Sequence, residues 1–159
     1  MRIVRLSLVA LALSVSLCCG GKSSPSQPST PTLASFTGGA WTLHVDRAWD
    51  GKSGSPQFPS DTLDESAYKS LSVGFSYQLV LTGGGQEVTI TGTIAGTVQA
   101  RRGKVTDTLV QYDVPDNGTF AGGRFVVWSS GEGLQGELTF YGSGVPITRS
   151  ERGFLVPAQ

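Results

Sequence analysis

The clearest pattern in the chain is an alternation of hydrophobic and polar positions over residues 70–82, SLSVGFSYQLVLT. The odd positions are apolar or aromatic, and most even positions between them are small or polar; the odd set is Leu71, Val73, Phe75, Tyr77, Leu79 and Leu81. A period of two predicts a β-strand with one buried face and one solvent-facing face. At about 3.4 Å per residue this strand would be about 40 Å long, so we expect it to bend.

The same alternation recurs after residue 39 in segments that turn residues separate. Strands are predicted at residues 40–46, 70–82, 87–100, 105–114, 119–129, 134–141 and 154–156, with turns at GGG (83–85), RRGK (101–104) and PDNG (115–118). Roughly seven strands without a helical period predict an all-β domain, a single antiparallel up-and-down meander that closes into a small barrel. A β-sandwich is the alternative, and closure is favoured because it removes exposed strand edges.

Two features of this pattern leave alternatives open. Glycines 92, 96, 122 and 136 share the parity of the apolar faces, so they either permit sharp coiling or leave room inside the barrel. The connection over residues 46–67 is unusually long and contains Trp49 and Phe58. These aromatic residues either plug one end of the barrel, or place Trp49 at a mouth where it stacks on a sugar or an apolar ligand.

The N-terminal region predicts export. Arg2 and Arg5 precede the uncharged residues 6–17, which are too few for a permanent membrane-spanning helix, so residues 1–18 are interpreted as a signal peptide. Residues 19–35 are rich in Gly, Ser, Pro and Thr, which predicts a flexible tether. The all-β domain is then assigned to residues 36–159, about 120 residues, the size of one ordinary domain.

The two adjacent cysteines, Cys18 and Cys19, follow the apolar run and resemble the lipobox of bacterial lipoprotein precursors. In that family a cysteine receives diacylglycerol and becomes the new N-terminus. We assign the lipid to Cys19, with Cys18 as the alternative, because Leu17 is bulky for the position before the cleaved bond. Ordinary signal-peptidase cleavage after residues 14–16 is a rival interpretation. The resemblance implies a palmitate-bearing membrane anchor and, because Gly20 follows Cys19, an outer-membrane location on the periplasmic or surface side.

Composition and charge narrow the range of functions. Arg2 and Arg5 leave with the signal, so ten of the 12 basic residues remain against 12 acidic ones, a net charge of about −2. No basic stripe is present, so nucleic acid is not an expected partner. The domain has no cysteine beyond its terminus and therefore no disulfide framework.

Catalytic and metal-binding chemistry has little support in the sequence. His44 is the single histidine, and no G-x-S-x-G motif accompanies it. Zinc would need several nitrogen or sulfur ligands, and the acidic residues Asp61, Asp64 and Glu65 lack the spacing of a calcium loop. We therefore expect no cofactor, no metal and no enzymatic activity.

The segment Gly39–Trp41, followed by a hairpin meander, resembles the start of calycin-type barrels such as lipocalins and avidins. The resemblance implies that Trp41 closes one barrel end, that the interior binds a small molecule, and that Tyr77, Trp128 and Phe140 are candidates for the cavity wall. The leading hypothesis is a lipid-anchored, non-catalytic binding or envelope-interaction module whose partner is a protein or glycan. A carrier of a small apolar ligand is the alternative, and a hydrolase is third. The first two differ in whether inward side chains fill the barrel.

Overall fold

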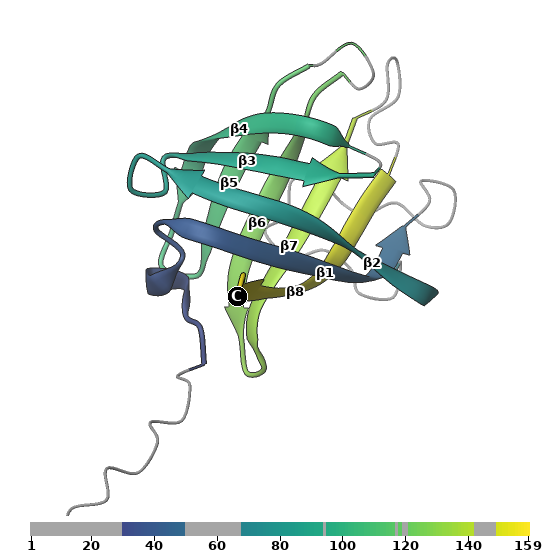
Figure 1. The fold of residues 1–159 in the computed structure, drawn as a ribbon, viewed down its shortest axis with the longest axis horizontal. Coiled ribbons are helices and arrows are strands. Elements are labelled where there is room, and N and C mark those ends of the chain that lie inside the picture. Colours follow the sequence, from purple (N-terminus) through teal and green to yellow (C-terminus); the bar gives the residue numbers. More distant parts are fainter. Residues whose placement is uncertain (1–29, 50–67, 94, 117, 119–120, 142–148) are drawn as a thin grey trace, which may run out of the picture.

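The computed structural model describes residues 30–49, 68–93, 95–116, 118, 121–141 and 149–159. In this part of the chain eight antiparallel strands form one closed barrel, in which β8 returns to pair with β1 (Figure 1). The strands are β1 (Gly39–Trp49), β2 (Lys69–Thr82), β3 (Glu87–Gly92), β4 (Gly96–Val105), β5 (Leu109–Val114), β6 (Gly123–Ser130), β7 (Gly133–Phe140) and β8 (Arg149–Pro157), preceded by the short 3-10 helix η1 (Leu33–Ser35). The predicted all-β meander and its closure are confirmed, and the sandwich alternative is wrong. Within these residues no helix is long and apolar enough to cross a bilayer.

Several predicted strand boundaries are wrong: the first and last strands are longer than predicted, and two turns are misplaced. Residues 87–100 contain a hairpin, because β3 ends at Gly92 and β4 begins opposite it at Gly96, whose φ is +63°. The sequence did not indicate this turn because the hydrophobic–polar alternation runs through it. Thr91 and Thr97, which pair across the turn, are both polar and both occupy odd positions. The RRGK segment instead continues β4, and the chain turns after it, where Thr106 Oγ1 accepts hydrogen bonds from backbone N–H groups of residues 108 and 109.

The barrel has two walls that cross each other. Strands β1 to β4 form one wall, nearest the viewer in Figure 1, and β5 to β8 form the other behind it. We call them the near wall and the far wall. The chain enters at one end of the barrel, where η1 lies, and we call this the η1 end.

Aromatic side chains close the η1 end. Phe36, directly after η1, packs edge-on against Trp41, Tyr112 and Phe125, with ring centroids 5.1, 6.2 and 6.4 Å away. The indole N–H of Trp41 donates to the carbonyl of Gly38 at 3.0 Å, and the Tyr112 hydroxyl donates to the carbonyl of Gly85 at 2.9 Å. Trp41 therefore lies at a closed barrel end, as the calycin resemblance implies, and the eight-stranded antiparallel barrel is compatible with a calycin-like fold.

Side chains also fill the middle of the barrel. A methyl group added at Gly136 would lie 3.0–3.2 Å from Leu43, Leu155 and Phe125, which is too close for an ordinary contact. A methyl group at Gly92 would overlap the ring of Tyr77. At these two positions the inward glycines therefore leave no open room inside the barrel, because neighbouring side chains occupy the space.

The first half of β2 departs from its predicted alternation. Tyr77, Leu79 and Leu81 are buried, but Val73 is 80% exposed. In the β1–β2 ladder Val45 pairs with Phe75, and the next pair is Arg47 with Ser70, so the four intervening β2 residues leave the ladder. β3 pairs with β2 only from residue 78 onward, so this part of β2 is less covered. Leu71 and Phe75 still pack partly against the core, whereas Val73 between them faces solvent.

Candidate functional site

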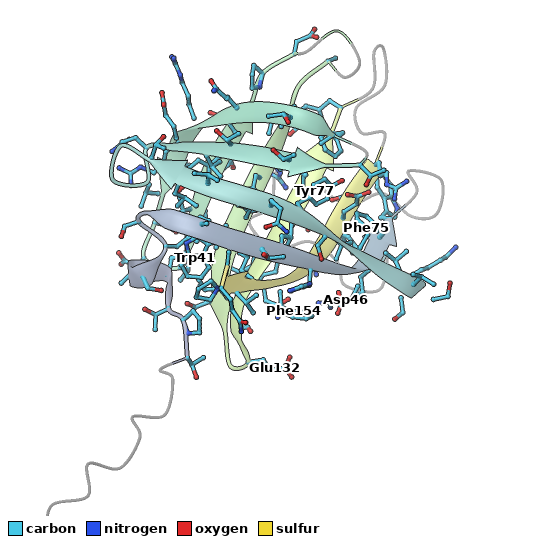
Figure 2. The ribbon with its side chains drawn as sticks, viewed as in Figure 1. Trp41, Asp46, Phe75, Tyr77, Glu132 and Phe154 are labelled. Carbon is cyan, nitrogen blue, oxygen red and sulfur yellow. The ribbon has the colours of Figure 1, made fainter. Side chains whose placement is uncertain are left out.

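A polar group lies inside the barrel at the end opposite η1. Glu151 pairs with the inward-facing Leu138 in the β7–β8 ladder, and its side chain is fully buried. The Tyr77 hydroxyl donates to Glu151 Oε2 at 2.5 Å, and Arg149 Nε donates to Oε1. The Arg149 side chain is 40% exposed, so this group reaches from the core to solvent. Figure 2 shows Tyr77 and Phe75 at this end of β2, with Trp41 at the other end of the barrel.

Burial determines the protonation of this group. Loss of solvent raises the pKa of Glu151 above its ordinary value of 4.5, against the lowering effects of the Tyr77 hydrogen bond and the Arg149 charge. Burial also raises the pKa of Tyr77, and the negative charge of Glu151 raises it further, so Tyr77 is a neutral hydrogen-bond donor at physiological pH. Both carboxylate oxygens of Glu151 therefore already have partners from the chain itself.

This raised pKa predicts a pH-dependent stability. A carboxyl group with a raised folded-state pKa contributes stability that is present below about pH 4.5 and is lost as the pH rises through the folded-state pKa. We expect Glu151→Gln, which cannot ionise, to become progressively more stable than the wild type as the pH increases from about 4 to about 8. Urea unfolding at each pH measures the difference in the free energy of unfolding. Glu132→Gln, at an exposed hairpin position labelled in Figure 2, is the control; a difference that shrinks with pH would contradict the assignment.

A second polar cluster lies on the outer side of the far wall, and we call it the outer cluster. Arg152 donates to Glu137 Oε2 through Nε at 3.2 Å and through Nη2 at 3.0 Å. The Tyr68 hydroxyl donates to the same oxygen at 2.8 Å and lies 2.8 Å from Ser150 Oγ, which in turn lies 2.8 Å from the Thr139 hydroxyl. All five side chains are buried, although they point away from the barrel interior. Burial and the adjacent charge of Glu137 raise the pKa of Tyr68, so its hydroxyl stays protonated.

Two of the predicted ligand-binding residues lie beside this cluster. The Arg152 guanidinium lies 4.3 Å from the Tyr68 ring centroid and 5.3 Å from that of Trp128. Trp49 pairs with Ser150 in the β1–β8 ladder and is 4% exposed. Trp49 and Trp128 are therefore on the outer side of the barrel, and Trp128 is not part of an inner cavity wall.

Local features of two strands explain why the sequence did not predict the outward positions of Trp49 and Trp128. The register of β1 shifts between Val45 and Arg47, so Trp49 faces outward although it shares the odd parity of the inward Trp41. In β6 the run FVVW (125–128) is apolar throughout, which hides the alternation between inward and outward positions. Glu137 in β7 and Arg152 in β8, which are charged residues within strands, were the available signal for the outer cluster.

The other predicted site residues lie apart from Trp49 and Trp128. Tyr77 and Phe140 are fully buried inside the barrel. Phe58, Cys18 and Cys19 lie outside the described residues. The structure therefore does not bring the four described candidates, Trp49, Tyr77, Trp128 and Phe140, together in one site.

His44 lies on the outer side of the near wall. Its Nδ1 is 2.9 Å from Ser76 Oγ, and its ring centroid is 5.2 Å from that of Phe154. Asp46 instead accepts a hydrogen bond from Arg47 Nε at 3.2 Å. Among the described residues no carboxylate pairs with the imidazole, so the Ser–His contact lacks the acid that orients a catalytic histidine. The same residues contain no group of three His, Cys, Asp or Glu side chains that could hold a metal ion.

The outer surface of the near wall carries polar side chains, exposed on β2 to β4 and half-buried on β1, and it has no lysine, arginine or carboxylate between its two ends. One row of directly paired residues crosses β1 to β4: Thr42, Gln78, Thr91 and Thr97. A second row crosses β8, β1 and β2: Phe154, His44 and Ser76. We call these seven residues the near-wall face. Phe154, which β8 of the far wall contributes at the edge next to β1, is 44% exposed, whereas Arg152 earlier in the same strand belongs to the buried outer cluster.

The chain was compared with models of protein families, with curated proteins and with solved structures. None of the three comparisons found a match. The candidate surfaces are therefore argued from the geometry of this chain alone.

Proposed function

We propose that the chain is an exported, non-catalytic binding module that a lipid on Cys19 holds at a bacterial outer membrane, and that it meets its partner on the outside of the barrel. The apolar run before Cys19 and the Ser/Pro-rich segment after it support the anchor. The described residues support the proposed position of the partner on the outside of the barrel.

The filled interior is the observation that carries this choice of surface. Phe36 and Trp41 occupy the η1 end, three side chains pack around Gly136 in the middle, and the Tyr77–Glu151–Arg149 group occupies the opposite end. A carrier needs a connected cavity large enough to enclose most of its ligand. Side chains at three levels along the barrel axis favour binding on the exterior instead.

The start of the described chain also suits a tethered module. The backbone N–H of Leu33 donates to Ser129 Oγ at 3.3 Å, so the segment before β1 lies along the end of β6 at the η1 end. Cys19 is eleven residues before Thr30, and an extended chain of this length spans at most about 40 Å. A lipid on Cys19 would therefore attach the barrel to the bilayer through its η1 end and would leave the near wall free of the anchor.

A carrier of a small apolar ligand is the second candidate. Phe75 is only partly buried, and it packs edge-on against Tyr77 at the barrel end opposite η1, with ring centroids 5.7 Å apart. Tyr77 in turn donates to Glu151, which accepts a hydrogen bond from the partly exposed Arg149. Native mass spectrometry of the purified protein distinguishes the candidates, because a carrier retains a stoichiometric small molecule.

The anchor is tested by replacing the cysteines one at a time. Cys19→Ser should abolish incorporation of labelled palmitate and move the protein out of the membrane fraction, because the thiol that receives the lipid is gone. Cys18→Ser is the matched control and should keep both the label and the membrane association. If the Cys18→Ser/Cys19→Ser double variant still carries palmitate and sediments with membranes, the proposed anchor is wrong.

A further inference from the structure

We infer that the near-wall face binds an uncharged glycan chain laid across strands β1 to β4. This inference rests on the proposed binding function and specifies its partner class and surface. Three properties of the face support it: the spacing of its polar row, its exposed aromatic ring and its lack of charge.

The polar row has the dimensions of a short run of sugar rings. Thr42 pairs with Gln78, Gln78 with Thr91, and Thr91 with Thr97, so one hydroxyl or amide stands on each of four adjacent strands. Strands lie about 4.8 Å apart, comparable with the length of one sugar ring, and the row is therefore about 14 Å long. A glycan lying along it would meet one polar side chain at each step.

The groups in this row suit sugar hydroxyls. The Thr42 hydroxyl donates to Gln78 Oε1 at 3.3 Å, and the hydroxyls of Thr91 and Thr97 are 3.3 Å apart. These contacts orient the side chains along the row. A glutamine amide has two N–H donors, and each threonine hydroxyl has two lone pairs, so the row presents both donors and acceptors to solvent.

Phe154 adds an apolar contact beside the polar row. Its ring is 44% exposed and packs at 5.2 Å and a 32° interplanar angle against His44. Ser76 Oγ lies 2.9 Å from His44 Nδ1, and this contact holds the imidazole ring in place. A fixed, exposed ring can stack against the C–H face of a sugar while the neighbouring row bonds its hydroxyls.

The distribution of charged side chains around this face favours a neutral partner. The charged side chains nearest to it lie at its two ends, where Arg101 pairs with Glu87 at 3.6 Å and Arg47 pairs with Asp46 at 3.2 Å. No lysine, arginine or carboxylate belongs to the near-wall face, so apart from His44 it has no basic side chain to neutralise a phosphate or a uronic acid. A protein partner would be expected to cover an apolar core with several aromatic residues, and this face has one exposed phenylalanine.

Binding of defined oligosaccharides by the full purified chain tests the inference. The probes are chitohexaose and laminarihexaose, which are neutral, and a heparin hexasaccharide, which is polyanionic; titration calorimetry measures each affinity. We expect the wild type to bind a neutral probe, Phe154→Ala to bind it about tenfold more weakly, and Gln78→Ala about threefold more weakly. Val105→Ala, at a valine that is 55% exposed beyond the uncharged rows, is the control and should bind like the wild type.

Several outcomes would overturn the inference. They are no binding of either neutral probe by folded protein, preference for the heparin probe, or equal affinities of the wild type and Phe154→Ala. Circular dichroism of each variant shows that it is folded. These outcomes leave the proposed lipid anchor intact, since palmitate labelling tests it independently, and cross-linking of a protein to this face would retain a binding module but exclude the glycan.

Discussion

Replacing Arg152 with methionine should lower the free energy of unfolding by about 3–5 kcal/mol, because it leaves the Glu137 carboxylate buried without its cation. Glu137 is 1% exposed and receives both Nε and Nη2 of Arg152 on one oxygen. The remaining donor to that oxygen, the Tyr68 hydroxyl, is neutral and cannot balance the charge. Urea unfolding followed by tryptophan fluorescence measures the loss.

Two further variants separate the buried ion pair from a general packing effect. The double variant Glu137→Leu/Arg152→Met should recover most of the loss, because neither charge remains in the low-dielectric site. Arg101→Met removes a cation from an exposed pair with Glu87, and it should cost less than about 1 kcal/mol. Additive losses in the double variant, or equal losses for Arg152→Met and Arg101→Met, would contradict the account.

Replacing Gly153 with alanine should destabilise the barrel by about 3 kcal/mol or more, because backbone atoms leave no room for a methyl group. The added carbon would overlap the carbonyl oxygen of His44 and lie 2.8 Å from Val45 Cα. Gly153 pairs with Val45 at the register shift, where β8 closes the barrel against β1. Since neither contact is with a flexible side chain, the two strands must separate to accept alanine.

Gly131→Ala is the matched control for this substitution. Among the described residues no heavy atom lies within 4 Å of the position its methyl group would take. We expect its free energy of unfolding to stay within about 0.5 kcal/mol of the wild type. Thermal melts followed by circular dichroism compare the two variants, and equal melting temperatures would show that β1 and β8 do not approach each other as closely as described.

The sequence by itself determined the fold class and much of the inner surface of the barrel. Alternation of hydrophobic and polar residues correctly predicted the faces of Tyr77 and Leu79 in β2, and turn residues indicated a meander of short strands. These features follow from local backbone geometry, because successive side chains of an extended chain point to opposite sides. The predicted signal, tether and lipid site also rest on sequence alone.

Only the tertiary structure decided which groups meet on each side of that barrel. The extra residue at the β1 register shift turns Trp49 outward, and pairing of β7 with β8 brings Glu137 beside Arg152. Local alternation carries no information about a bulge or about the register between two strands, because both depend on packing and hydrogen bonding with a partner strand. For the same reason the polar row of the near-wall face exists only after β1 to β4 have paired, and Phe154 joins the face only when β8 closes the barrel against β1.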